Sequence, residues 1–213
     1  MSLKVVFING SPHPKGSTWR SMVEISKVLH EEGIIVEWIH VGAQPVRGCM
    51  GCNACRAGGL GRCKYGDDVV NVAIARMEQA DGLIIGSPVH YAGASGAITS
   101  FLDRMFYAAK SKETFYGKPG AAIVCCRRGG STAALEQLNK YFTISNMPIV
   151  SSYYWNMVHG NSPEEVVQDE EGMFVMRQLG RNMAWMLKSL QAAKEQGISF
   201  PYVEEETRMN FIR

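Results

Sequence analysis

The chain has 213 residues, of which 46% are hydrophobic and 20% charged, and its formal net charge at pH 7 is +2. This length suits one domain with a sizeable core, and the near-balanced charge favours neither nucleic acid nor an anionic membrane surface as a partner. The chain opens directly into an apolar strand pattern without signal-peptide features, and no apolar run approaches the ~20 residues that span a bilayer. We therefore expect a single cytoplasmic domain over residues 1–213 that binds neither nucleic acid nor membrane.

The first predicted element is a buried strand at Lys4–Asn9, because its apolar run is typical of parallel strands. A loop rich in Gly, Ser and Pro follows and leads into a helix predicted over 18–32. Backbone N–H groups, hydroxyls and a helix N-terminus grouped in this way can hold a phosphate. The loop matches neither the dinucleotide fingerprint nor the P-loop. Its hydroxyls suit a terminal monophosphate, and the alternative is a plain helix cap formed by Ser17 or Thr18.

A second strand is predicted at Ile34–Ile39, and an insertion over about 42–66 follows it. The insertion holds a C-x2-C-x2-C-x7-C run formed by Cys49, Cys52, Cys55 and Cys63. The start of this run has the spacing of iron–sulfur ligands, because thiolates two residues apart can wrap one face of a cubane. Three other interpretations stay open: a closed zinc site, a redox-active thiol pair at Cys49 and Cys52, or reduced thiols that only shape the loop.

Helices and strands alternate over the rest of the chain. The predicted elements are a helix that begins at Asp67 and Asp68, a strand at Gly82–Gly86, a helix over 97–106, a strand at Ala121–Cys126, a helix that ends near 146, a strand at Pro148–Tyr153, a helix over 173–196 and an extension over about 198–213. Strands that alternate with helices form parallel βαβ units with right-handed crossovers. We therefore predict an α/β fold with a doubly wound five-stranded parallel sheet, strand order 2-1-3-4-5, and helices on both faces.

Three of the loops that follow predicted strands have unusual residues, at positions 11–18, 87–93 and 127–132. In a sheet of this order, the loops after strands one, three and four meet at the carboxyl-terminal edge, beside the switch point between strands one and three. One molecule could therefore place a phosphate in the first loop and a flat ring against the other two.

Four segments resemble the NADPH-dependent FMN reductase family of flavodoxin-like proteins: Gly10-Ser11-Pro12, Gly16-Ser17-Thr18, Ser87–Tyr91 and Phe101–Arg104. The resemblance covers nearly the full chain, and the cysteine run resembles that of the iron–sulfur flavoprotein branch. It implies FMN with its phosphate in the first loop and its isoalloxazine ring between the other two loops. The residues that it assigns to FMN binding are Ser11, Lys15, Gly16, Ser17, Thr18, Pro88, Val89, His90, Tyr91, Cys126, Arg127, Gly129 and Gly130.

The resemblance also implies an activity and partners. The expected activity is an oxidoreductase that passes hydride from NAD(P)H through bound FMN to a quinone, a flavin or another small acceptor. The alternative is an iron–sulfur flavoprotein that carries electrons, with a [4Fe–4S] cluster on Cys49, Cys52, Cys55 and Cys63. The family also implies a homodimer or homotetramer, with the cysteine insertion, the last helix and the tail at the contacts.

No side chain is expected to act as the catalyst, because the flavin carries the redox chemistry. Arg127 or Arg128 follows the fourth strand and could stabilise the negative charge of a reduced flavin; the alternative is a solvated surface pair. His90 could stack on the flavin or donate to it, or it could bond to the backbone of its own loop. Asp103 and Arg104 are expected to form a structural or subunit contact.

Overall fold

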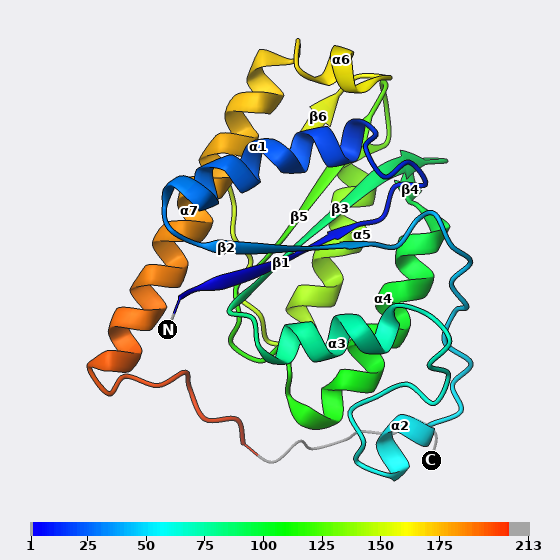
Figure 1. The fold of residues 1–213 in the computed structure, drawn as a ribbon, viewed down its shortest axis with the longest axis vertical. Helices are drawn as coiled ribbons and strands as arrows, with labels where there is room; N and C mark the ends of the chain where they lie inside the picture. The colour runs from blue at the N-terminus through cyan, green and yellow to red at the C-terminus, as the bar shows by residue number, and fades with distance from the viewer. Residues whose placement is uncertain (1, 205–213) are drawn as a thin grey trace, which may run out of the picture.

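A computed structural model describes residues 2–204 and shows a twisted sheet between two layers of helices (Figure 1). Five strands run parallel in the order β2-β1-β3-β5-β6, and a short strand, β4, pairs antiparallel with β3. The strand bounds are β1 (Lys4–Asn9), β2 (Ile35–His40), β3 (Gly82–His90), β4 (Gly93–Ala94), β5 (Gly120–Cys126) and β6 (Met157–His159). Apart from β4, this is the predicted order of five parallel strands, so the fold class is confirmed.

Helices cover both faces of the sheet, as predicted. Their bounds are α1 (Ser17–Glu31), α2 (Ala54–Ala57), α3 (Val70–Glu78), α4 (Gly96–Ala109), α5 (Ser131–Thr143), α6 (Pro163–Val166) and α7 (Glu170–Glu195), with a 3-10 turn, η1 (Lys110–Lys112), after α4. One apolar cluster joins the sheet to α3, α4 and α5, and a second joins it to α1 and α7. Along β1, Val6 and Ile8 enter the first cluster while Val5 and Phe7 enter the second. The continuous apolar run follows from burial on both faces.

The strand predicted at Pro148–Tyr153 is wrong. Ile149 forms only an isolated bridge to Gly120, the chain then leaves the sheet, and β6 takes the fifth position. The Ser152 hydroxyl donates to the backbone oxygen of Tyr154 at 2.7 Å, and a serine that bonds to its own backbone competes with the strand ladder. The side chain of Asn182 also donates to the backbone oxygen of Ser151, which holds the segment against α7.

The loop predicted after the third strand is a hairpin instead. β3 continues past Gly86 to His90 and returns through β4, so that Tyr91 and Ala92 form its two-residue turn. Both turn residues have left-handed backbone angles, with φ of 49° and 60°, which is the requirement of a type I′ turn. The hairpin therefore projects beyond the carboxyl-terminal edge of the sheet, with the Tyr91 side chain fully exposed at its tip.

The extension predicted over 198–213 is described only as far as residue 204; the remainder lies outside the described residues. Within residues 198–204 the chain is irregular. The ring of Phe200 packs edge-on against Tyr116 at 5.1 Å, and the Tyr116 hydroxyl donates to the backbone oxygen of Pro201 at 2.8 Å.

Glu24 links the two helices on one face of the sheet. Its carboxylate accepts hydrogen bonds from Arg177 on α7 at 3.1 Å and from Arg20 on α1 at 3.3 Å. Burial by itself raises the pKa of the Glu24 carboxyl, but the two arginines and Lys27 together outweigh it, so the pKa lies below its usual range. Such a carboxyl stabilises the fold above its unfolded pKa of about 4.5, and this contribution is lost as the pH falls through the lower folded value.

We predict that Glu24→Gln lowers the free energy of unfolding by about 1 kcal/mol at neutral pH, because charge-assisted bonds of a half-buried carboxylate are lost. The difference from the unsubstituted protein should shrink below pH 4.5. Urea denaturation at neutral pH and below pH 4.5 measures this difference in unfolding free energy. Glu136→Gln, at an exposed position on α5, is the matched control and should change little. A pH-independent difference would contradict the assignment.

Candidate functional site

The side chain of Asn9 shapes the first loop from inside. Its Oδ1 accepts the N–H of Ser11 at 3.0 Å, and its Nδ2 donates to the backbone oxygen of Pro14 at 3.2 Å. The Ser11 Oγ in turn accepts the N–H of His13 at 3.2 Å. The loop is therefore held in one conformation by its own side chains, and its Ser11 is buried within it.

Two helices at this edge of the sheet begin without a side-chain cap. The N-cap residue of α1 is Gly16 and that of α5 is Gly130, and within the described chain no side chain accepts a hydrogen bond from either helix start. By contrast, Ser95, Ser162 and Asp169 cap α4, α6 and α7. An uncapped helix start presents N–H donors and the positive end of the helix dipole. Both helix starts are therefore suited to an anionic or electron-rich ligand group.

Hydrogen bonds join the first loop to the hairpin and to α4. The N–H of Gly10 donates to the backbone oxygen of Gly86 at 2.8 Å. The Ser95 hydroxyl donates to the backbone oxygen of Gly10 at 2.8 Å, and its N–H donates to the Ser87 hydroxyl at 3.0 Å. Ser87 and Ser95 are both buried. This pair of serines was not predicted as part of the site, although Ser87 lies in one of the predicted loops.

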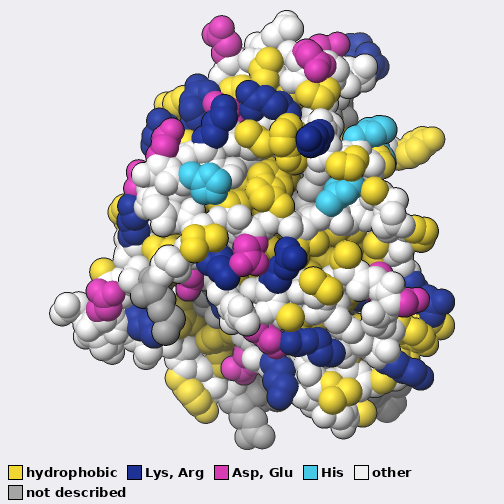
Figure 2. All heavy atoms as spheres, in the orientation of Figure 1, with side chains coloured by type: hydrophobic (Ala, Val, Ile, Leu, Met, Phe, Trp, Pro, Cys, Tyr) yellow, Lys and Arg dark blue, Asp and Glu magenta, His cyan; other side chains and the backbone are white. Residues whose placement is uncertain are grey.

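The hairpin also contacts the loop after β5. A Cβ atom added to Gly130 would lie 2.6 Å from the Cα of Ala92 and 3.0 Å from the side chain of Val89. The predicted three loops therefore meet at one edge of the sheet. Figure 2 shows that histidine, basic and hydrophobic side chains gather on the surface beside β4, at this edge.

The predicted FMN-binding residues differ in exposure. The exposed ones are Lys15, His90, Tyr91, Arg127 and Gly129; the half-buried ones are Gly16, Ser17, Pro88, Val89 and Gly130; and the buried ones are Ser11, Thr18 and Cys126. The Thr18 side chain packs over the backbone of Gly86. Arg128, like Arg127, is exposed just past β5.

The two cysteines at the end of β5 are interior thiols. Burial raises the pKa of Cys125 to about 12, and it also raises the pKa of Cys126 even though Ser131 hydrogen-bonds to the sulfur. Both thiols are therefore neutral at physiological pH, where a neutral thiol is a poor nucleophile.

The four cysteines of the insertion line one cavity together with Arg104 and Tyr107. Cys49 and Cys52 are exposed, whereas Cys55 is buried and Cys63 is half-buried. In the part of the chain that the structure describes, no three His, Cys, Asp or Glu side chains are close enough to hold a metal ion. The donor set, four thiols, is the kind that binds soft metals and iron–sulfur clusters, but the sulfurs do not converge on a single ion.

Arg104 connects α4 to this insertion. It is 2% exposed, its Nε donates to the Sγ of Cys63 at 3.3 Å, and it forms an ion pair with Asp68. The expected structural contact is therefore present within the chain, but its partner sulfur was not predicted. The available signal was a charged pair, Asp103 and Arg104, in the middle of an otherwise apolar helix stretch.

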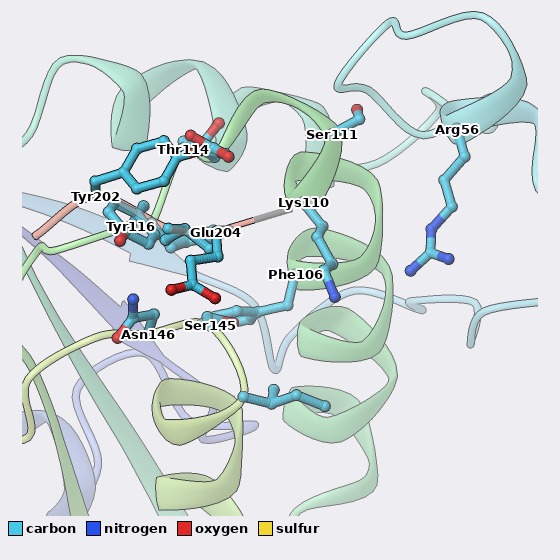
Figure 3. Close-up of a pocket in the computed structure, with 14 residues that line it drawn as sticks. Arg56, Phe106, Lys110, Ser111, Thr114, Tyr116, Ser145, Asn146, Tyr202 and Glu204 are labelled. Atoms are coloured by element: carbon cyan, nitrogen blue, oxygen red, sulfur yellow. The ribbon is translucent and has the colours of Figure 1, made fainter. Parts of the chain in front are cut away.

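A cavity of about 670 Å³ lies away from these loops, at the other end of α4 (Figure 3). Phe106, Thr114, Tyr116 and Tyr202 are among the residues that line it. Because α4 starts at the three loops and this cavity lies beyond its last turn, the cavity does not belong to the candidate site.

Residues 3–162 match the model of a family described as NADPH-dependent FMN reductase. The chain belongs to this family. An iron–sulfur flavoprotein of Methanocaldococcus jannaschii is 31% identical over 196 residues, which are 89% of this chain and 100% of the relative. An iron–sulfur flavoprotein of Methanosarcina thermophila is 23% identical over 197 residues, 91% of this chain and 100% of the relative. Membership supports FMN as the cofactor and a flavin oxidoreductase or electron carrier as the class of protein.

Solved structures show the fold. RosB with a bound flavin intermediate superposes with a TM-score of 0.70 at 14% identity, covering 100% of this chain and 94% of RosB. A flavodoxin from the domain Archaea gives 0.59 at 13% identity, covering 87% and 99%. The flavodoxin-like fold is therefore confirmed. Among residues 2–204, no helix has both the length and the apolar character needed to cross a membrane.

The contact between Gly130 and the hairpin gives a paired test of the site. Gly130→Ala should weaken FMN binding at least tenfold and lower the melting temperature, because Gly130 has φ of +93° and the new methyl would overlap Ala92. Gly96→Ala, at an exposed position at the start of α4, should change neither, because nothing lies within 4 Å of a Cβ at that position. Fluorescence titration of the apoprotein with FMN measures affinity. Equal behaviour of the two variants would contradict the contact.

Proposed function

We propose that the protein binds FMN at the carboxyl-terminal edge of its sheet and oxidises NAD(P)H, passing the electrons to a small acceptor such as a quinone or another flavin. The observation that carries this proposal is the pair of uncapped helix starts, α1 and α5, on either side of the β3–β4 hairpin. Membership of the FMN reductase family supports the same cofactor.

The start of α1 suits the phosphate. The first N–H groups of the helix and the hydroxyl of Ser17 would donate to the phosphate oxygens, and the exposed Lys15 would add positive charge. Ser11 would support this arrangement from below, since its own Oγ is already engaged with the N–H of His13.

The hairpin and the loop after β5 suit the ring system. Pro88 and Val89 are half-buried and present apolar surface, and Tyr91 lies at the exposed tip of the hairpin. Gly129 has open space around it, so that the backbone there could approach a flat ring closely. The positive end of α5, together with Arg127 or Arg128, would stabilise negative charge at the ring.

Bound FMN would supply the hydride and electron transfer, so no protein acid or base is needed for that step. The protein's part is to bind the phosphate, fix the orientation of the ring and keep one side of it accessible to NAD(P)H. The exposed arginines and histidines around the edge would also attract an anionic co-substrate.

We predict that protein purified without air shows a flavin absorption spectrum that bleaches within seconds of adding NADPH or NADH. A strong low-potential donor serves as the positive control, because it reduces the flavin whatever the natural donor. A flavin that bleaches with the control donor but with neither nicotinamide would overturn the reductase proposal. Apoprotein that fails to take up FMN would overturn the site itself.

A second candidate is an electron carrier with a [4Fe–4S] cluster on the four cysteines. It is favoured by their position around one cavity and by the names of the relatives, which are iron–sulfur flavoproteins. The insertion also lies along α4, because a Cβ at Gly48 would lie 3.8 Å from the Ser100 hydroxyl. Ser100 is little more than one helical turn beyond Ser95. Since Ser95 bonds to Gly10, the thiols and the proposed FMN loop share one helix. A bound cluster would pass single electrons.

We predict that protein reconstituted anaerobically with iron and sulfide retains about four iron atoms per chain after desalting, one for each thiolate of a cubane. Cys63→Ser should lose most of this iron, because it removes one of the four thiols. Cys125→Ser is the matched control, since its thiol is interior and lies in the apolar cluster on the other face of the sheet from Cys55, and it should retain the iron. Iron absent from the unsubstituted protein, or retained equally by both variants, would overturn the cluster.

We further propose that the chain forms a homodimer or homotetramer that uses α7. Large apolar side chains are exposed on α7 and on the irregular segment before β6, namely Tyr153, Tyr154, Trp155, Phe174 and Trp185. Exposed aromatic clusters of this kind are typical of subunit contacts.

A further inference from the structure

We propose that Arg104 is the positioning residue of the cysteine insertion: it holds Cys63 in place and raises the reduction potential of whatever the four cysteines bind. This inference rests on the second candidate function, in which they bind a [4Fe–4S] cluster. It adds a residue outside the cysteine run, on α4, to that site.

Arg104 is bound on every side by groups of the insertion or its flanks. Its Nε donates to the Sγ of Cys63 at 3.3 Å, its Nη2 to the backbone oxygen of Tyr65 at 2.5 Å and its Nη1 to the backbone oxygen of Arg47 at 3.3 Å. It also pairs with the carboxylate of Asp68. These contacts fix the chain just before Cys49 and just after Cys63, the two ends of the cysteine run.

The charge balance around Arg104 explains why the contact matters for redox chemistry. Its side chain is 1% exposed and that of Asp68 is 11% exposed, so one buried cation faces one carboxylate and one sulfur. A cluster held by four thiolates is negatively charged and gains one more negative charge when it is reduced. A positive charge and an N–H donor at a ligand sulfur stabilise the reduced form more than the oxidised form, and so raise the potential.

A purely structural clamp would have the same contacts but a different consequence. If Arg104 were only a clamp, substitution of Arg104 or of Asp68 would loosen the insertion and lower iron retention. The reduction potential could then change in either direction. A charge effect has a direction. Removal of the Arg104 charge should lower the potential, whereas removal of the Asp68 charge leaves Arg104 uncompensated beside Cys63 and should raise it.

The experiment compares Arg104→Gln, Asp68→Asn and the control Arg62→Gln in full-length, anaerobically reconstituted protein. Arg62 is in the same insertion and forms a two-point ion pair with Glu78, at 2.6 and 2.7 Å, but does not contact a sulfur. Redox titration monitored by electron paramagnetic resonance gives the cluster potential, and circular dichroism and FMN content report the fold.

We expect Arg104→Gln to shift the one-electron equilibrium about tenfold toward the oxidised cluster, or ~59 mV downward. Asp68→Asn should shift it upward, and Arg62→Gln should leave it unchanged. If Arg104→Gln does not fold, the potential of Asp68→Asn is the test: an upward shift supports the role of Arg104, and no shift overturns it. Unchanged potentials in an iron-loaded protein would overturn the role of Arg104 and leave the cluster intact as a candidate. Absence of iron from the unsubstituted protein would overturn both.

Discussion

The buried hydroxyl of Ser95 holds the functional edge of this molecule together. It donates to the backbone oxygen of Gly10 in the first loop, while its N–H donates to Ser87 at the base of the hairpin, and the same oxygen caps α4 by accepting from Ile98. A buried hydroxyl with all its bonds satisfied is costly to disturb, because each lost partner leaves a polar group without water. Ser95, together with the backbone bond from Gly10 to Gly86, therefore fixes the relative placement of the first loop, the hairpin and α4.

Through α4, the same interaction determines where the cysteine insertion lies. Ser95 precedes the helix and Arg104 is nine residues further along, a rise of about 13 Å at 1.5 Å per residue. Arg104 binds both ends of the cysteine run. The same helix is therefore bonded to the first loop at its start and to the insertion about two and a half turns later. A helix packed against the sheet along one face is a rigid connector. The proposed flavin edge and the thiols are for this reason held at a defined separation within one chain.

Apolar runs were sufficient to predict β1, β3 and β5, because these strands are buried in the middle of the sheet. β2 is a half-buried edge strand with Glu37 and His40, and the strand order was expected from the alternation of strands and helices. The fifth strand was misplaced: Pro148–Tyr153 is half apolar, but Ser152 bonds to its own backbone segment and β6 has only three residues. The hairpin was missed because neither Tyr91 nor Ala92 is a typical left-handed residue. The sulfur contact of Arg104 joins residues 41 positions apart, and nothing local in the sequence records such a pairing.

Among residues 2–204, and apart from the four-residue α2, the α-helices whose starts lack a side-chain hydrogen bond are the two that begin at the candidate site. α4, α6 and α7 begin with a side-chain cap, and Asp68 accepts the first N–H of α3. A glycine at the N-cap costs only a few tenths of a kcal/mol relative to Ser, Thr, Asn or Asp, so the fold tolerates a helix start that is left open in this way. α1 and α5 begin at glycines instead, and both begin at the edge where the three loops meet. Since a side chain at Gly130 would overlap the hairpin, the absence of a cap there also keeps the backbone close to Ala92. The same glycine thus leaves the helix start open and brings the two walls of the candidate site together.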